Sequence, residues 1–167
     1  MSKGDLQYVV GDVTNPQRHF KNEVAIIPHC CNNLGVMGAG VAFALKTKWP
    51  QAEKEYLNNG YRIGSVSFAS IRDNNETHTV IANMVAQEGL KSKNNLKPIK
   101  YYYLIKCMEK VFNFIDIMKF ENENKKIVIH APEFGGLRAG GNFAFIRELI
   151  QEMWVDNGID VKIYQFK

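Results

Sequence analysis

The chain has 167 residues, of which 46% are hydrophobic and 23% charged, which suits one globular domain with a single core. Its formal charge is only +4 and its Lys and Arg residues are scattered, so we expect no nucleic-acid partner. The first residues are too polar for a signal peptide, and no apolar run approaches membrane-spanning length, so we expect neither secretion nor a membrane.

The cysteines argue against disulfide bonds. There are three of them, Cys30, Cys31 and Cys107, and the two adjacent ones should point to opposite faces of a strand. A staple or a paired metal site is therefore not expected. We expect a reduced, cytoplasmic and monomeric protein.

In the first half of the chain we expect the order strand, strand, helix, helix, strand, strand. These elements should cover residues 6–10, 24–28, 41–49, 51–59, 65–71 and 79–86. The second run is apolar without alternation, as in a strand buried on both faces. Pro50 ends one helix and suits the first turn of the next, which Gly60 closes. A turn at residues 73–75 should join the last two strands.

In the second half, a polar loop leads to the longest helix, which Pro98 should open. Strands are expected at 127–131 and 159–163, with a helix capped by Asn142 between them. The loop contains a group of lysines, namely Lys91, Lys93, Lys97 and Lys100. They indicate either a solvated loop or a preference for small anionic ligands.

This alternation predicts the α/β class, as a three-layer α/β/α sandwich. Its mixed sheet should have about six strands with helices on both faces. We expect a single domain over residues 1–167, because no linker or repeat interrupts the pattern.

Two of the expected strands each lead into a glycine-rich loop and then a helix. The first loop contains Gly38-Ala39-Gly40, and the second covers residues 132–142, PEFGGLRAGGN. Such an arrangement brings bare backbone N–H groups and the positive end of a helix up to a phosphate. An ordinary tight turn would also explain either loop alone. Two loops of this kind can hold the two sides of a pyrophosphate.

Taken together, these segments resemble the macro domain family, which binds ADP-ribose and its derivatives. Four segments match in the family's order: GDVT at 11–14, HCCN at 29–32 with MGAG at 37–40, the loop 132–142, and VKIYQF at 161–166. They span nearly the whole chain. The resemblance implies ADP-ribose or ADP-ribose-1″-phosphate as the ligand, and ADP-ribosylated protein as a further partner.

The resemblance also implies roles for particular residues. Asp12 would accept a hydrogen bond from the adenine amino group, although an Asx turn alone would justify an aspartate there. Val13 and Phe166 would contact the adenine, and Asn32 would reach the distal ribose. The pyrophosphate would lie between the two loops, at Gly38, Ala39 and Gly40 and at Phe134, Gly135, Gly136, Leu137, Ala139 and Gly140.

Within the family, the chain looks closer to the branch of ADP-ribose-1″-phosphate phosphatases and glutamate-linked ADP-ribosyl hydrolases. The lysine and aspartate of those hydrolases fall near Ala86 and at Ala139 here, and the aspartate of other macro hydrolases is Ala42. His29 matches the phosphatase-type histidine. We therefore expect it to act as nucleophile or general base on ADP-ribose-1″-phosphate, without a metal or cofactor.

Alternatives remain for the function. His29 could simply bond the backbone at a strand end. The chain could be a non-catalytic reader of ADP-ribosylated protein, a sequestering protein, or an ADP-ribosyl-protein hydrolase. Chemistry by Cys30 or Cys31 has no identifiable activating partner.

Overall fold

The computed structural model describes residues 2–73 and 77–166. Over these residues strands and helices alternate in nearly the expected order. The strands are β1 Leu6–Val10, β2 Glu23–Asn32, β3 Val66–Arg72, β4 His78–Gln87, β5 Lys126–Pro132 and β6 Asp160–Gln165. The helices are α1 Gly40–Lys48, α2 Gln51–Asn59, α3 Tyr101–Glu121 and α4 Phe143–Met153, with the short 3-10 helix η1 Val155–Asn157.

The strands form one mixed sheet in the order β1-β6-β5-β2-β4-β3. Only the β3–β4 pair is antiparallel among the strand pairs of the described residues. The carboxyl ends of β1, β6, β5, β2 and β4 therefore point the same way. Ligands of α/β proteins bind beyond this edge of the sheet.

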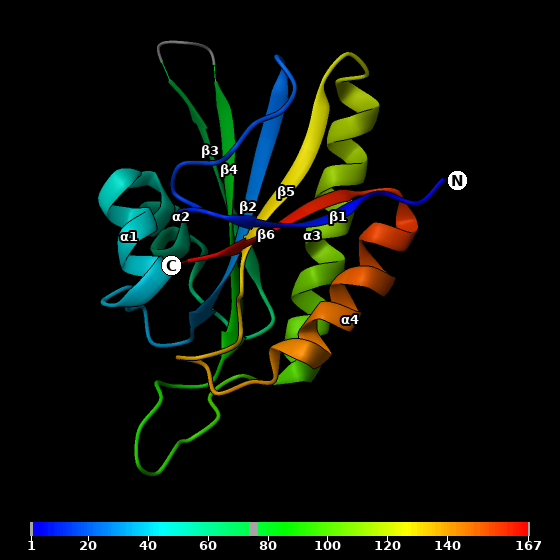
Figure 1. The fold of residues 1–167 in the computed structure, drawn as a ribbon. Coiled ribbons are helices and arrows are strands. Elements are labelled where there is room, and N and C mark those ends of the chain that lie inside the picture. The colour runs from blue at the N-terminus through cyan, green and yellow to red at the C-terminus, as the bar shows by residue number, and fades with distance from the viewer. Residues whose placement is uncertain (1, 74–76, 167) are drawn as a thin grey trace.

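Helices cover both faces of the sheet, so the predicted three-layer α/β/α sandwich is confirmed. In Figure 1, α1 and α2 lie on one side and α3 and α4 on the other. Neighbouring residues of β2 face the two sides in turn: Ile26 belongs to the core under α3 and α4, and Ile27 to the core that includes Leu45 of α1. In the part of the chain described, no helix is long and apolar enough to cross a membrane.

A buried chain of polar groups fastens the segment between β1 and β2 to the sheet. The Glu23 carboxylate lies 2.5 Å from Nε2 of His130, and Nδ1 of that ring lies 2.7 Å from the Tyr164 hydroxyl. The same hydroxyl accepts a hydrogen bond from Gln17 N at 2.7 Å. Burial lowers the pKa of His130, which favours a neutral ring that donates to Glu23. The network thus holds the turn after β1 against β6.

Two boundaries differ from the sequence prediction by more than two residues. β2 continues four residues past Pro28, to Asn32, because its pairing with β5 already ends at Ile26 and the missing N–H of Pro28 breaks no bond to β5. α3 begins at Tyr101 and not at Pro98, because Ile99 is extended and its N–H donates to Ala139 O at 3.1 Å. Of the turn predicted at 73–75, residues 74 and 75 lie outside the described residues.

Candidate functional site

Asp12 and Phe166 follow the ends of the neighbouring strands β1 and β6. Oδ1 of Asp12 accepts hydrogen bonds from N (2.9 Å) and Oγ1 (2.8 Å) of Thr14, so the carboxylate does hold an Asx turn. Its second oxygen has no protein donor in the described part of the chain. Phe166 is 81% exposed, whereas the side chain of Val13 is buried in the core, so Val13 offers a ligand chiefly its backbone.

Asn32 shapes the first glycine loop from inside. Its Nδ2 donates to Val36 O (2.8 Å), and its Oδ1 accepts from Leu34 N (3.0 Å). The buried Tyr56 hydroxyl lies 2.9 Å from the same Oδ1 and accepts from Gly35 N at 3.0 Å. The carbonyl oxygen of the side chain is thus occupied by the protein. A contact of Asn32 with a distal ribose remains a prediction.

The first glycine loop delivers backbone N–H groups to the start of α1. Ala39 is the N-cap residue, with no side-chain cap, and the first turn contains no acidic residue. Gly40 has φ +62°, a conformation that favours glycine. Across the described chain, no protein acceptor faces the N–H groups of Gly38, Ala39 or Gly40. These donors and the helix dipole favour an anion.

The second loop is anchored at both ends and open at its tip. Phe134 packs against Trp154 in the core, and Gly140 (φ +74°) lies so close to Leu96 O that an added Cβ would be 2.2 Å from it. Leu137, at the tip, is 93% exposed. Gly135 and Ala139 are buried and shape the loop. Among the described residues, the N–H groups of Gly136, Leu137 and Arg138 have no hydrogen-bond acceptor and are free to bind a ligand.

The two loops meet through Arg138, which the sequence did not single out. A Cβ added to Gly40 would lie 2.8 Å from Cδ and 2.9 Å from Nε of Arg138. The glycine therefore allows this side chain to cross from the second loop to the start of α1. The loop after β4 packs beside them: Lys91 Nζ donates to Leu137 O at 3.1 Å, and this loop projects past the edge of the sheet in Figure 1.

His29 does not lie at a strand end, because β2 runs on for three more residues. Its ring is 2% exposed, and Nε2 lies 2.6 Å from Oδ1 of Asn83 on β4. Both N–H groups of Asn83 are used, on Ala52 O and Ser67 Oγ, so His29 must donate from Nε2. Burial lowers its pKa to about 4, which keeps the ring neutral at pH 7. A catalytic role for His29 stays a prediction, and it requires the ring to leave this pair.

The cysteines are also sequestered. Burial raises the pKa of both Cys30 and Cys31, so neither supplies a thiolate near neutral pH. Cys31 Sγ lies 3.7 Å from the His29 ring, while Cys30 packs on the opposite face of the sheet. Cys30 and Cys31 therefore point to opposite faces of the strand, as predicted.

The resemblance places the hydrolase residues at or near three alanines, whose side chains are buried or half-buried here. Ala86 and Ala139 are buried, and Ala42 is half-buried. Among residues 2–73 and 77–166, no group of three or more His, Cys, Asp or Glu side chains could hold a metal ion. Independence from metal remains a prediction.

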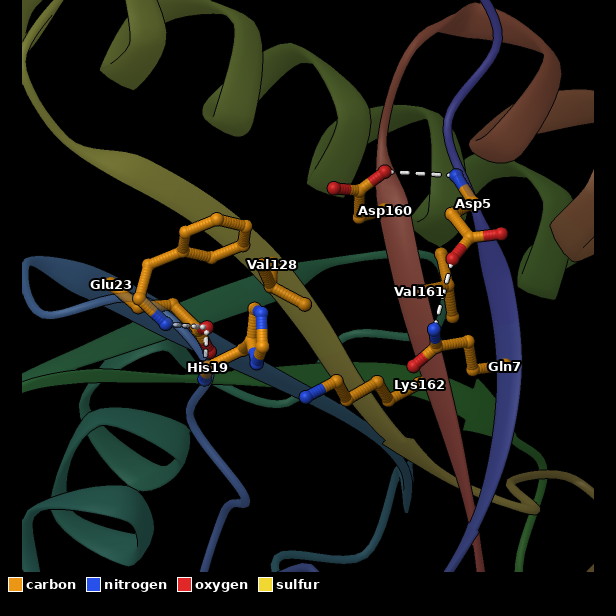
Figure 2. A pocket seen from close by; sticks show the side chains of 9 residues that line it. Asp5, Gln7, His19, Glu23, Val128, Asp160, Val161 and Lys162 are labelled. Atoms are coloured by element: carbon orange, nitrogen blue, oxygen red, sulfur yellow. Dashed lines mark hydrogen bonds between the residues drawn. The ribbon is translucent and has the colours of Figure 1, made fainter.

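A pocket of about 280 Å³ lies away from the glycine loops, where β2 and β6 begin (Figure 2). Its charged groups already have partners in the protein. Asp160 accepts from Asp5 N at 2.8 Å and pairs with Lys126 at 2.7 Å, and Lys162 donates to Gln17 O at 2.7 Å. These groups hold the sheet edge together, so we place the functional site at the glycine loops.

No protein-family model matches the sequence. The chain is 29% identical over 170 residues to chromodomain-helicase-DNA-binding protein 1-like of Danio rerio, covering 97% of this chain and 16% of the relative. It is 34% identical over 61 residues to an ADP-ribose 1″-phosphate phosphatase of Saccharomyces cerevisiae (strain YJM789), covering 36% of this chain and 32% of the relative. The chain therefore spans a third or less of the length of these relatives.

Solved structures resemble the chain over nearly its whole length. A protein of unknown function from Bacteroides thetaiotaomicron has a TM-score of 0.77 at 28% identity, covering 96% of this chain and 98% of the other. A macrodomain protein from Streptomyces coelicolor has a TM-score of 0.74 at 28% identity, covering 96% and 99%. The Thermus aquaticus DarG macrodomain shares the fold, with a TM-score of 0.68 at 20% identity, covering 97% and 99%.

Sheet order, helical layers and paired glycine loops define an α/β/α domain of the macrodomain class. The chain has the macrodomain fold, which confirms the resemblance to the macro domain family that its four sequence segments predicted.

Proposed function

We propose that this chain binds ADP-ribose and its derivatives across the two glycine loops. One observation carries the proposal: two sets of backbone N–H groups without protein acceptors lie on loops that meet at Gly40 and Arg138. Oriented amides of this kind form concavities that bind anions. A structural neighbour, Thermosipho africanus DarTG in complex with ADP-ribose, has the same fold at 15% identity.

In this proposal the ligand runs along the carboxyl edge of the sheet. Its adenine lies against Asp12, Val13 and the exposed Phe166, whose ring can stack on a base. Its distal ribose lies toward Asn32. The diphosphate is held between the loops, by Gly38, Ala39 and Gly40 on one side and Phe134, Gly135, Gly136, Leu137, Ala139 and Gly140 on the other.

Calorimetric titration with ADP-ribose near pH 7 tests this function. At a ligand concentration of about 100 times Kd, binding should stabilise the fold by roughly 2.7 kcal/mol. For a domain of this size, the melting temperature should rise by about 5–10 °C. If millimolar ADP-ribose produces no heat and no thermal shift, the proposal is refuted.

Asp12→Asn should change which base the site prefers. The amide oxygen can still hold the Asx turn with Thr14, but an NH₂ group replaces the second carboxylate oxygen. The adenine amino group then loses its acceptor, so ADP-ribose affinity should fall about 10-fold, while GDP-ribose should gain relative to it. Competition titrations of both nucleotides measure the ratio. If the ratio is unchanged, Asp12 only holds the turn.

A second candidate function is hydrolysis of ADP-ribose-1″-phosphate to ADP-ribose and phosphate. It is favoured by the partial likeness to two yeast ADP-ribose 1″-phosphate phosphatases, 34% identical over 61 residues and 35% over 51 residues. Water would attack the phosphorus directly, with a base taking its proton, or a nucleophile would attack first and water would then break the resulting phospho-enzyme bond. In either route the bond from phosphorus to the 1″ oxygen breaks and that oxygen takes up a proton. His29 is the proposed base or nucleophile, although its ring is buried against Asn83 in this structure.

Phosphate release from ADP-ribose-1″-phosphate separates the two candidates. A binder or reader of ADP-ribosylated protein takes up this nucleotide without releasing phosphate. A phosphatase that uses His29 releases it, and His29→Ala should then lower the rate by about 10²–10⁴-fold while ADP-ribose affinity stays within a few-fold. Equal release by wild type and His29→Ala would exclude His29 as the catalytic group.

A further inference from the structure

Arg138 sits at the tip of the second glycine loop. The loop is closed behind it, because the N–H groups of Ala139 and Gly140 both donate to Gly136 O, at 3.1 and 2.7 Å. From this tip the side chain reaches back over Gly40, within the space that a Cβ would need. The Arg138 side chain therefore bridges the space between the two glycine loops.

The guanidinium of Arg138 is not paired with an anionic group of the described residues. Within the described chain, Arg138 has no carboxylate and no hydrogen-bond acceptor as partner. What it touches is the start of α1, which carries a partial positive charge and has neither a side-chain cap nor an acidic residue in its first turn. An anion placed between the two would be attracted by both.

We propose that Arg138 is a charged lid of this site. It rests on Gly40 when the site is empty, and it moves aside to pair with the phosphate oxygens when a diphosphate enters. The inference rests on the proposed ADP-ribose binding and deepens it, because it makes a side-chain cation, in addition to backbone amides, select for a diphosphate.

Arginine suits this role better than lysine. Its planar guanidinium can donate two parallel hydrogen bonds to phosphate oxygens, and it stays charged at any physiological pH. A ligand that lies against the N–H groups of Gly38 to Gly40 must displace the side chain from Gly40. The displaced group remains tethered beside the diphosphate and replaces water there.

Isothermal titration of four proteins tests the lid: wild type, Arg138→Gln, Arg138→Lys and the control Arg147→Gln. Arg147 is an exposed arginine of α4. The probes are ADP-ribose, adenosine and inorganic pyrophosphate, at about 50 and 300 mM salt. Circular dichroism and melting temperature confirm that each variant is folded.

Arg138→Gln should weaken ADP-ribose binding about 10- to 100-fold, and Arg138→Lys by an intermediate factor. Pyrophosphate binding should weaken in parallel, whereas adenosine binding and the Arg147→Gln control should stay at wild-type values. The loss of ADP-ribose affinity at high salt should be smaller in Arg138→Gln than in wild type. In wild type, the Arg138 Nε resonance should shift when pyrophosphate is added.

Several results would overturn the lid. If Arg138→Gln binds ADP-ribose as tightly as wild type, the lid is wrong while the binding function stands. Equal weakening for adenosine and ADP-ribose would show that Arg138 only shapes the site. If wild type binds pyrophosphate through Arg138 but not ADP-ribose, the anion contact stands and the proposed function fails. If it binds neither, both proposals fail.

Discussion

Gly40→Glu should abolish ADP-ribose binding, with a loss of affinity of more than about 100-fold, while the protein remains folded. Gly40 begins α1 and lies under Arg138. A glutamate there would place a carboxylate where the diphosphate is proposed to lie and would offer Arg138 an internal partner. The new carboxylate would repel the diphosphate, and by pairing with Arg138 it would take that cation away from the ligand.

The fold should tolerate this change. The atoms that a Cβ would meet belong to the flexible end of Arg138 and can move away. The positive φ of Gly40, +62°, adds a strain of about 1–2 kcal/mol. A melting temperature within a few degrees of wild type and a native circular dichroism spectrum are therefore expected.

Gly60→Glu is the matched control. Gly60 follows α2 with φ +87° and would carry a Cβ with nothing within 4 Å, so it shares the backbone strain and the added charge without the site. It should bind ADP-ribose as wild type does. If Gly40→Glu retains wild-type affinity, the first glycine loop is only a turn.

Asn32→Ala should lower stability and ligand affinity together. The change leaves Val36 O and Leu34 N without their side-chain partner, and it removes one of the two acceptors of the buried Tyr56 hydroxyl, which keeps Asn32 O at 2.6 Å. The free energy of unfolding should fall by about 2–5 kcal/mol, and the melting temperature by about 5–15 °C. Because the loop that leads to Gly40 loses its internal bonds, ADP-ribose should bind about 10-fold or more weakly.

Tyr56→Phe separates a loop-holding role from a ligand contact. Tyr56 is fully buried, and its hydroxyl bonds Asn32 and Gly35 within the protein, so it does not reach a ligand. Loss of the hydroxyl should lower both the stability and the ADP-ribose affinity, each by less than Asn32→Ala does. Tyr102→Phe, at an exposed tyrosine of α3, is the control and should change neither. If only Asn32→Ala weakens binding, and without loss of stability, then Asn32 contacts the ligand directly.

The sequence by itself determined the elements whose signals are local. The strand β1, the helix α2 ended by Gly60, and α4 capped by Asn142 appear where the pattern placed them. Apolar periodicity and capping chemistry act over a few residues, so a single sequence contains them. The order of the four matching segments likewise predicted the macrodomain fold, and with it the layered α/β/α architecture.

Only the tertiary structure decided which side chains are free to act. His29 looked available because the apolar run before it ends at Pro28, yet it is buried against Asn83, a residue 54 positions away. Asn32 is engaged by Tyr56, 24 positions away, and the Gly40–Arg138 contact joins two loops from different strands. Strand pairing and loop packing create these contacts between distant residues. Residue type and spacing could therefore predict the two glycine loops as the site, but could not predict that the Arg138 side chain lies between them.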